Sequence, residues 1–545
     1  MNLDLVATAV FIFLFLFVTW LGFVAARWRK ADLNVLHEWG LGGRRFGTVV
    51  TWFLLGGDLY TAYTFIAVPA LVFGKGAMGF FAIPYTILIY PILYLMFPRL
   101  WAIAHAKGHV TAADFIRDRF GSRMLALAVA VTGIVATMPY IALQLVGMEV
   151  VIGALGFPAG GFVGHLPLII AFIVLAAFTY TSGLRAPALI AIVKDTLIFV
   201  TIFAAVVIIP ARLGGYGAIF ASVPQEKLLL APPAEGSLGS YSAYATLALG
   251  SALSLFLYPH SMTGILSASN GEVIRRNAAM LSAYSFILGL IALLGYMAVA
   301  AGVDKDPAFT AGFTQYGANF AVPALFLSSF SSWFVGVAFA AIAIGALVPA
   351  AIMSIACANL FTRNLYKEFM RPDCTEADEA RVAKIVSLVV KVGAVVFILA
   401  IPQDYAIQLQ LLGGIWMIQL LPPIVLGLYT RAFNPIALLL GWIAGTAIGT
   451  YMAASQGFTS SVYPLAIFGV TVPGYAALYS VVINLLVAMV LSLLFDLVAR
   501  RGAPRRRDNC RRRRQCGTRP RRIMWIGSGV ATQTALDRED IDHGK

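Results

Sequence analysis

The sequence is poor in charge: Asp, Glu, Lys and Arg make up 12% of its 545 residues, whereas hydrophobic residues make up 60%. An ordinary soluble domain has about a quarter of its residues charged. The mean hydropathy, +0.85, is also far above the soluble range. This composition excludes a soluble globular fold and indicates an integral membrane protein.

Cysteine is scarce as well. The four cysteines, Cys357, Cys374, Cys510 and Cys516, fall in a predicted helix, an inner loop and the C-terminal tail. No paired framework lies on the outer side of the membrane, where disulfides form. We therefore predict no structural disulfide.

Catalytic spacings are missing too. A membrane enzyme needs a nucleophile beside a base, or a metal motif such as H-E-x-x-H, and the apolar spans contain neither. His37-Glu38 lacks the second histidine, and His105 and His109 lie in a basic loop where surface histidines are common. We predict no enzymatic activity, no cofactor and no metal site.

Apolar stretches of near twenty residues recur along the chain, the length of a helix that crosses a hydrocarbon layer about 30 Å thick. Cutting the sequence at its polar breaks gives about thirteen spans, so we predict an all-α integral membrane fold. The span at 324–361 is over-long and should tilt or include an interfacial approach segment. The spans are 5–26, 48–73, 78–100, 123–155, 165–182, 186–210, 241–263, 278–302, 324–361, 382–401, 405–429, 434–455 and 473–499.

Basic residues predict the side of the membrane that each loop faces. Basic clusters fall on alternate loops, among them Arg27-Trp28-Arg29-Lys30 and the stretch from Arg363 to Lys384, whereas the opposite loops at 211–240 and 303–323 are poor in cations. The start, Met1 to Asp4, lacks the basic flank of a signal peptide, so the first helix is expected to be retained. The N-terminus is predicted outside and the C-terminus inside.

Two glycines and an aspartate, Gly56-Gly57-Asp58, interrupt the apolar stretch from Val49 to Phe73. A carboxylate at mid-membrane costs roughly 2.5 to 3.5 kcal/mol or more, so it should face a cavity or a partner. Glycines make unwinding of the helix easy, which would free backbone carbonyls for a cation and a half-helix N-terminus for an anion. The alternative is a glycine packing notch with a buried, neutral aspartic acid.

A second interruption follows five spans later, at Tyr258-Pro259-His260 and Gly264. Proline removes a hydrogen bond and kinks the helix beside an ionisable side chain. Transporters commonly contain two inverted halves, each with a discontinuous helix at the corresponding place. Prolines also kink membrane helices without marking a site, but the matched positions favour two repeats.

The two interruptions divide the chain. We expect an extra helix and inner loop at 1–46, a first inverted repeat at 47–215, a second at 216–430, two C-terminal helices at 431–499 and a basic tail at 500–545. The tail is expected to be disordered and to touch anionic lipid rather than nucleic acid.

Five short segments then resemble a known family. They are Gly57-Asp58-Leu59-Tyr60-Thr61 with Ala70-Leu71-Val72-Phe73, Tyr140-Ile141-Ala142-Leu143-Gln144, Ser182-Gly183-Leu184-Arg185-Ala186, Tyr258-Pro259-His260, and Phe361-Thr362-Arg363-Asn364-Leu365-Tyr366-Lys367. In order and on these spans, they resemble the sodium:solute symporters over about residues 5–500. The resemblance implies a five-plus-five inverted repeat of the leucine-transporter type in a bacterial plasma membrane. The most similar subfamily is the acetate and monocarboxylate permeases, which implies symport of lactate, pyruvate, acetate or propionate.

The chain departs from the family's second sodium site. That site uses carbonyls of the first broken helix, here expected at Gly56 and Leu59, with a carbonyl and two hydroxyls from the ninth span. An ungapped count from Leu365-Tyr366-Lys367 puts Gly345 at the carbonyl position but Val348 and Pro349 at the hydroxyl positions, where neither side chain has an oxygen. Another alignment recovers Ser354, at the cost of a six-residue deletion inside a helix.

The sixth span departs in the same direction. Ala191 stands where many family members carry an aspartate thought to lie on the sodium exit path, and Lys194 follows, beside Asp195. The Lys194 ammonium would take the place of sodium, and burial would help it to lose its proton, which makes a proton the favoured coupling ion. The alternatives are a structural Lys194–Asp195 pair, a lysine that snorkels to the inner surface, and sodium coupling.

An anionic solute would be bound by donors at the two breaks. Asp58 would repel it unless protonated or turned toward a cation such as Lys194. The expected donors are Tyr60, Thr61 and Tyr63 at the first break and Tyr258 and His260 at the second.

Two further spans carry polar groups. Tyr140 and Gln144 are one helical turn apart and share a face, while Gln408, Trp416 and Gln419 suit an outer gate. For each, the alternative is a satisfied interhelical hydrogen bond.

Other functions stay open at this point. One is sodium-coupled symport of another small organic solute; another is a non-transporting membrane sensor built on a transporter fold. Such sensors carry long cytoplasmic signalling domains, and the tail here is shorter than fifty residues. The expected partners are a small monocarboxylate, a proton or sodium ion and membrane lipid, with the oligomeric state open.

Overall fold

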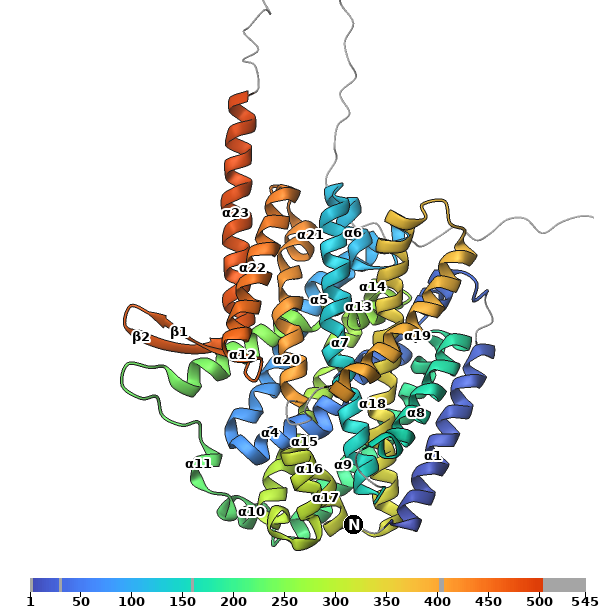
Figure 1. Ribbon diagram of the computed structural model, residues 1–545, viewed down its shortest axis with the longest axis vertical. Helices are drawn as coiled ribbons and strands as arrows, with labels where there is room; N and C mark the ends of the chain where they lie inside the picture. Colours follow the sequence, from blue (N-terminus) through green and yellow to red (C-terminus); the bar gives the residue numbers. More distant parts are fainter. Residues whose placement is uncertain (1–2, 29–31, 158–160, 401–405, 503–545) are drawn as a thin grey trace, which may run out of the picture. The chain divides into compact units, whose positions relative to one another are not determined.

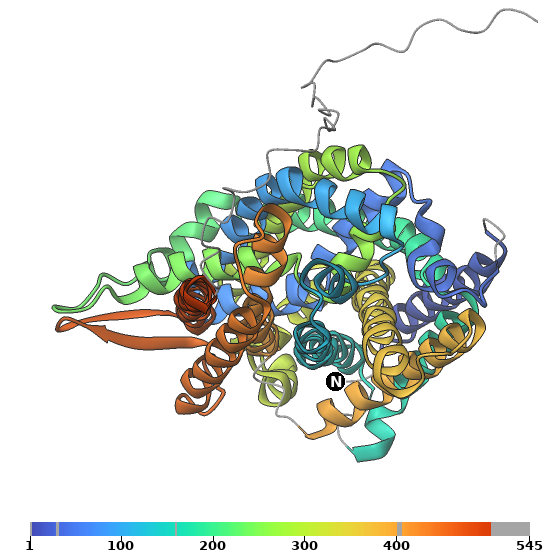
Figure 2. The ribbon, with the colours of Figure 1, turned by 90° about the horizontal axis from the view of Figure 1, so that it is seen from above.

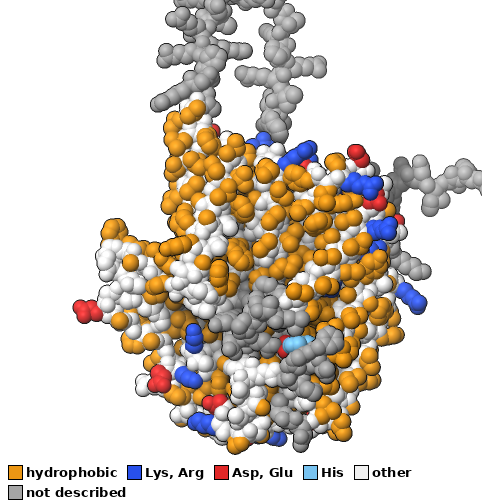
Figure 3. All heavy atoms as spheres, viewed as in Figure 1, with side chains coloured by type: hydrophobic (Ala, Val, Ile, Leu, Met, Phe, Trp, Pro, Cys, Tyr) orange, Lys and Arg blue, Asp and Glu red, His pale blue; other side chains and the backbone are white. Residues whose placement is uncertain are grey.

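The computed structural model describes residues 3–28, 32–157, 161–400 and 406–502 (Figure 1). The described residues up to Phe495 form one compact unit. Hydrophobic side chains cover the flank shown in Figure 3, and most Lys, Arg, Asp and Glu side chains lie toward its two ends. This distribution suits a protein whose sides face hydrocarbon and whose ends face water.

Each predicted apolar span coincides with a helix or a pair of helices. Among the described residues, ten helices are long and apolar enough to cross a membrane, or eleven if the bent pair α12–α13 is one span; the thirteen-span count stays a prediction. The helices are α1 (Leu5–Val24), α3 (Thr48–Leu59) with α4 (Val68–Lys75), α5 (Ala82–Lys107), α7 (Arg123–Ala154), α8 (Gly161–Ser182), α9 (Arg185–Arg212), α12 (Gly239–Leu255) with α13 (Pro259–Leu266), α15 (Ser282–Ala301), α17 (Ala321–Ser329) with α18 (Ser332–Phe361), α19 (Glu376–Ala400), α20 (Ala406–Met417), α22 (Pro435–Ser455) and α23 (Ala476–Gly502).

Shorter helices lie in the connections. The over-long span at 324–361 is divided at Phe330-Ser331, so that α17 precedes α18 as a separate segment. The remaining short helices are α2 (Leu36–Leu41), α6 (Ala112–Phe120), α10 (Tyr216–Ser222), α11 (Gln225–Leu228), α14 (Gly271–Met280), α16 (Thr310–Tyr316) and α21 (Gly427–Tyr429).

The core is built around α18, which is buried along almost its whole length. It packs against α7, α1 and α9, and Figure 2 shows α7 and α18 side by side in the middle of the bundle. Its alanines and glycines allow close approach: a Cβ at Gly336 would lie 2.5 Å from the Ala7 carbonyl oxygen. Small residues at such contacts are the usual means by which membrane helices pack.

The first interruption lies three residues beyond the position expected from the glycines. Helix α3 runs through Gly56 and Gly57 and ends at Leu59, and Tyr60 leaves the helical conformation with φ −94° and ψ 88°. A π-helical turn at Tyr63–Ala67 leads into α4. The glycines serve close approach instead: a Cβ at Gly56 would lie 2.1 Å from Cζ of Tyr284. The packing-notch alternative therefore describes the glycines, and the unwinding occurs just after them.

The second interruption lies at the predicted proline. Helix α12 ends at Leu255, α13 begins at Pro259, and their axes are bent by 48°. Proline at the first position of a helix is favourable because its missing N–H would have no partner there. The chain thus restarts a helix directly beside His260.

One element departs from the all-α prediction. Strands β1 (Val462–Ile467) and β2 (Val470–Tyr475) form an antiparallel hairpin, with Val462 opposite Tyr475. The turn residues Phe468 and Gly469 both have positive φ, 49° and 82°. Two left-handed turn residues match the right-handed twist of a two-residue hairpin. The fold is otherwise all-α, as predicted.

Candidate functional site

Lys194 of α9 reaches the first interruption. Its ammonium donates hydrogen bonds to the carbonyl oxygens of Gly57 and Tyr60, both at 3.0 Å. The side chain is completely buried, so it does not snorkel to a surface. Because the helix stops at Tyr60, these carbonyls are turned toward a side chain instead of the next helical turn, which is how discontinuous helices hold cations.

Asp195, the next residue on α9, is buried in the same place. One carboxylate oxygen lies 2.9 Å from the Lys194 ammonium, and the other accepts a hydrogen bond of 2.6 Å from the Tyr284 hydroxyl on α15. A buried ion pair is tolerated only when further hydrogen bonds satisfy its polar atoms. Two carbonyls and one phenol supply those bonds here.

The carbonyls that bind the ammonium lie one residue beyond the expected pair. The Gly56 carbonyl accepts from the backbone N–H of Tyr60 at 3.0 Å, and the Leu59 carbonyl accepts from the Thr64 hydroxyl. Both are therefore occupied within the segment itself. The shift follows from the position of the break, since only carbonyls near its edge lose their helical partners.

Helix α18 passes the same point without adding side-chain oxygens. A Cβ at Gly345 would lie 4.0 Å from the Tyr60 carbonyl oxygen, so this glycine lies beside one of the two carbonyls that bind Lys194. Val348 and Pro349 are buried and apolar. The Ser354 hydroxyl, which the rival alignment recovers, donates within its own helix to the Ala351 carbonyl at 2.8 Å.

A second polar cluster surrounds the proline break. The rings of Tyr140, Tyr258 and His260 contact one another, with centroids 5.5 Å apart for the two tyrosines and 5.4 Å from each tyrosine to the imidazole. His260 is fully buried, and neither ring nitrogen has a hydrogen-bond partner among the described residues. The buried Tyr63 hydroxyl likewise has none there. Unpartnered buried polar atoms are rare and indicate a place for a ligand or water.

Gln144 of α7 is hydrogen-bonded to the segment after the first interruption. Its side-chain oxygen accepts from the N–H of Ala62, at 3.0 Å, and its amide donates to the Tyr140 carbonyl at 3.3 Å. The Thr61 hydroxyl accepts from the N–H of Tyr63. Gln144 thus makes the interhelical hydrogen bond that was the alternative to solute contact. Thr61 makes a hydrogen bond within its own turn.

Three predicted residues point elsewhere. The Tyr60 hydroxyl donates to the Tyr284 carbonyl at 3.1 Å, on the Lys194 side. Gln408 accepts from the N–H of Ser461 at 3.1 Å, and Trp416 donates to the Thr450 hydroxyl at 3.0 Å. Gln408 and Trp416 therefore face the C-terminal segments and do not join the Tyr140–His260 cluster. The side chain of Asp58 lies outside the described residues.

Gln419, the third residue of the outer gate predicted on the span 405–429, is hydrogen-bonded to neighbouring segments. The Gln419 amide donates to the Ser480 hydroxyl at 2.8 Å and to the Ile415 carbonyl at 3.0 Å. Gln408 does line an open cavity together with Lys75, Tyr316 and Asn319. For Trp416 and Gln419, the structure shows hydrogen bonds to neighbouring helices.

Sequence reasoning missed several tyrosines. Tyr284 donates a hydrogen bond to Asp195, and Tyr85 and Tyr475 are buried. Tyr475 ends the hairpin and donates to the Leu411 carbonyl at 2.5 Å. Nothing in the local sequence marks these residues, because each contact joins distant helices.

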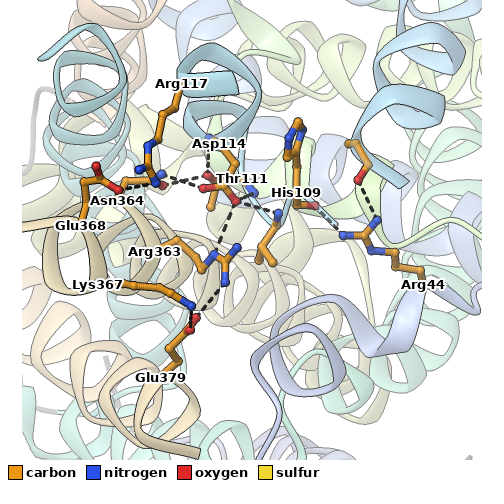
Figure 4. Close-up of polar contacts among 12 residues, drawn as sticks. Arg44, His109, Thr111, Asp114, Arg117, Arg363, Asn364, Lys367, Glu368 and Glu379 are labelled. Carbon is orange, nitrogen blue, oxygen red and sulfur yellow. Dashed lines mark hydrogen bonds and ion pairs between the residues drawn. The ribbon is translucent and has the colours of Figure 1, made fainter. Parts of the chain in front are cut away.

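A polar network joins α6 to the end of α18 (Figure 4). Asp114 and Thr111 form a capping box at the start of α6. Asn364 donates to Asp114 and accepts from Thr111, both at 2.8 Å. Arg363 pairs with Glu379 of α19 at 3.0 Å. Near this network, burial lowers the pKa of His109, so its imidazole is held toward the neutral form.

Two interrupted helices with buried polar groups beside them are typical of secondary transporters. The chain belongs to the sodium:solute symporter family, whose model matches residues 39–445. It is a multi-pass protein of the bacterial inner membrane, with a fold of the leucine-transporter type.

The chain is also similar to individual transport proteins and to a solved structure. A protein of Rhizobium johnstonii named monocarboxylate transport permease protein is 54% identical over 500 residues, covering 90% of this chain and 98% of that protein. The uncharacterized symporter YodF of Bacillus subtilis is 34% identical over 449 residues, covering 82% and 87%. The structure of a Na+-coupled sialic acid symporter in a substrate-bound outward-open state superimposes with a TM-score of 0.73 at 13% identity, covering 90% of this chain and 98% of that one. At that identity the likeness shows the fold alone.

Proposed function

We propose that this protein imports short-chain monocarboxylates such as lactate, pyruvate, acetate or propionate, driven by a proton gradient. The observation that carries the proposal is the Lys194 ammonium on the carbonyls of Gly57 and Tyr60. It supplies one positive charge at the break. Unlike a metal ion, that charge can be removed by losing a proton.

The surroundings support an ammonium over a bound sodium ion. A sodium ion here would need hydroxyl oxygens from α18, and the side chains of Val348 and Pro349 offer none. Gly345 lies beside the Tyr60 carbonyl but has no side chain that could bind a cation. Loss of the proton would remove the charge that holds the two carbonyls, so the broken helix would be freer to move in one protonation state than in the other.

The second cluster suits a small anion. His260 and Tyr63 present buried nitrogens and a hydroxyl with no partner among the described residues, and they can donate to a carboxylate. The aromatic rings of Tyr140 and Tyr258 close around His260, which favours a short side chain on the solute. The Rhizobium relative named as a monocarboxylate permease supports this solute class.

Transport by purified protein in proteoliposomes tests the proposal. Labelled lactate or acetate should accumulate when an inward pH gradient is imposed without sodium. A sodium gradient at equal pH should give no accumulation. Accumulation driven by sodium alone would overturn the proton assignment.

Replacing Lys194 by methionine tests the residue. Lys194→Met should abolish accumulation yet retain solute exchange, because exchange needs no net proton movement. The matched control is Lys391→Met: Lys391 is also buried in a membrane helix, but it bonds to Ser387 of its own helix. Full accumulation by Lys194→Met would make this lysine structural only.

Sodium-coupled uptake of another solute is the second candidate, favoured by membership of the sodium:solute symporter family. It requires Lys194 to leave the carbonyls. In that case sodium would stimulate uptake, and Lys194→Met would keep sodium-driven accumulation.

A further inference from the structure

Tyr284 donates to Asp195 a hydrogen bond that the sequence does not predict. We propose that Tyr284 is a positioning residue, which holds Asp195 in its ionised form beside Lys194 and thereby sets the pH range over which the protein takes up solute. This inference rests on the proposed proton coupling. It adds a residue of α15 to a site otherwise built from α3 and α9.

The two contacts of Asp195 differ in kind. The Lys194 ammonium lies 2.9 Å from one carboxylate oxygen, yet that oxygen has no aligned hydrogen bond. Lys194 and Asp195 are neighbours on one helix, and adjacent side chains do not face each other. The aligned ammonium bonds go to Gly57 and Tyr60 instead. The contact with Lys194 is thus mainly Coulombic.

The Tyr284 hydroxyl makes the aligned bond. Its distance to the second carboxylate oxygen, 2.6 Å, is that of a charge-assisted O–H···O bond. Both partners are buried, so no bulk water competes for the carboxylate. Removing this donor would leave Asp195 with the neighbouring charge alone.

The position of Tyr284 is fixed by the break itself. Its ring contacts those of Tyr60 and Trp52, with centroids 4.5 Å and 4.8 Å away. Its backbone carbonyl accepts from the Tyr60 hydroxyl, and its ring fills the space over Gly56. A movement of the broken helix would therefore move the donor relative to Asp195.

Few other ionisable groups face Asp195. Lys194 comes from its own helix, Tyr284 from α15 and Tyr60 from the break, with Tyr90 of α5 acting on Tyr284. Helices α1, α17 and α18, which also pack against α9, contain no charged residue, and α8 carries only His165. In α3, only Asp58 is charged, and its side chain is not described. Tyr284 is therefore the group outside α9 that donates a hydrogen bond directly to the pair.

The consequence is a shift in pH dependence. A hydrogen bond to a carboxylate favours its charged form. Without the Tyr284 hydroxyl, the Lys194–Asp195 pair should keep its proton to higher pH. The external pH at which gradient-driven uptake is half-maximal should rise by about one unit, the size expected for one hydrogen bond to a buried charge.

Tyr284→Phe tests this, since it keeps the ring that packs on Gly56. Uptake of labelled lactate into proteoliposomes would be measured across external pH, beside wild type and Tyr90→Phe. Tyr90 is the matched control, because its hydroxyl bonds to Ser285, the next residue of α15, at 2.8 Å. The expected result is a raised midpoint for Tyr284→Phe alone. A Tyr284→Phe profile that superimposes on both controls overturns the proposal.

A double-mutant cycle tests whether Tyr284 acts through Asp195. Asp195→Asn can still accept the Tyr284 hydroxyl, but it carries no negative charge for that hydrogen bond to stabilise. Adding Tyr284→Phe to Asp195→Asn should then move the profile no further. A further shift in that background would show that Tyr284 acts elsewhere. If an imposed pH gradient does not change uptake by the wild-type protein, the proposed function itself is contradicted.

Discussion

Gly56 shows how a residue without a side chain can shape the site. A Cβ there would lie 2.1 Å from Cζ of Tyr284, closer than any real contact, so Gly56→Ala must displace the ring or the helix. Overpacking of this kind costs about 1 to 3 kcal/mol. We expect Gly56→Ala to lower the thermal unfolding temperature in detergent and to reduce uptake, because the Tyr284–Asp195 bond is disturbed.

Gly74→Ala is the control for that prediction. Nothing lies within 4 Å of a Cβ at Gly74, near the end of α4. The added methyl should therefore be neutral or slightly stabilising, since alanine suits a helix better. Equal loss of stability in both variants would show that the space over Gly56 is not what matters.

Individual residues of the site were partly predictable from the sequence. Lys194 could be predicted because it stands beside Asp195 in the sixth span, three residues after Ala191, where many members of the resembled family carry an aspartate. The carbonyls that the resemblance implies for a cation, Gly56 and Leu59, lie one residue before the pair that binds the ammonium, because the resemblance does not fix the residue at which the helix ends. Tyr284 could not be predicted: its contact with Asp195 joins residues 89 positions apart, and a tyrosine in a membrane helix is unremarkable.

At the scale of elements, α6 depends on a cap that also binds another helix. Asp114 closes the capping box with Thr111 and accepts from Asn364, so Asp114→Ala removes both bonds. Loss of a cap costs about 0.5 to 2 kcal/mol, and loss of a bond to a charged group adds to it. We expect Asp114→Ala to lower the unfolding temperature more than Asn364→Ala, which leaves the capping box intact.

The comparison within α6 is Asp118→Ala. Asp118 pairs with Lys107 at 2.5 Å, but both side chains are exposed or half-buried. Such surface pairs contribute less than about 1 kcal/mol. Unfolding followed by tryptophan fluorescence would rank the three variants, and an Asp118→Ala effect as large as that of Asp114→Ala would contradict the role of the cap.

Helices were predicted well because their hydropathy identifies them. The hairpin was predicted poorly because it depends on local backbone geometry. Every predicted span contains a helix, because twenty apolar residues in a row have few other uses. The proline break was also predictable, since proline cannot donate the missing bond. The hairpin was not, because Pro464 and Pro473 stand opposite each other in it and the segment reads as a loop.

For the whole molecule, the basic residues predict an orientation that thiol labelling can test. Cys374 lies between α18 and α19, on the side predicted to be inside, and Cys357 is buried. With Cys510 and Cys516 changed to serine, an impermeant maleimide should label inside-out vesicles and spare right-side-out ones. Burial, followed by the charge of Glu379, raises the pKa of the Cys374 thiol. Because the thiolate reacts, labelling should therefore be performed in alkaline buffer.

A cysteine at the hairpin tip supplies the opposite result. Phe468 is fully exposed, at 102%, and follows one further crossing after the basic loop at Arg431. Phe468→Cys, in a background without Cys374, should be labelled in right-side-out vesicles only. Labelling of both positions from the same side would overturn the predicted topology.

The ammonium of Lys194 is attached to the protein by its own side chain, so it reaches its carbonyls at an effective concentration that no change in the medium can lower. A diffusing ion would leave its site as the surroundings became dilute. A tethered one stays, and only acidity changes its charge. On the proposed function, a cell with this transporter should take up organic acids equally well in salt-poor and salt-rich water.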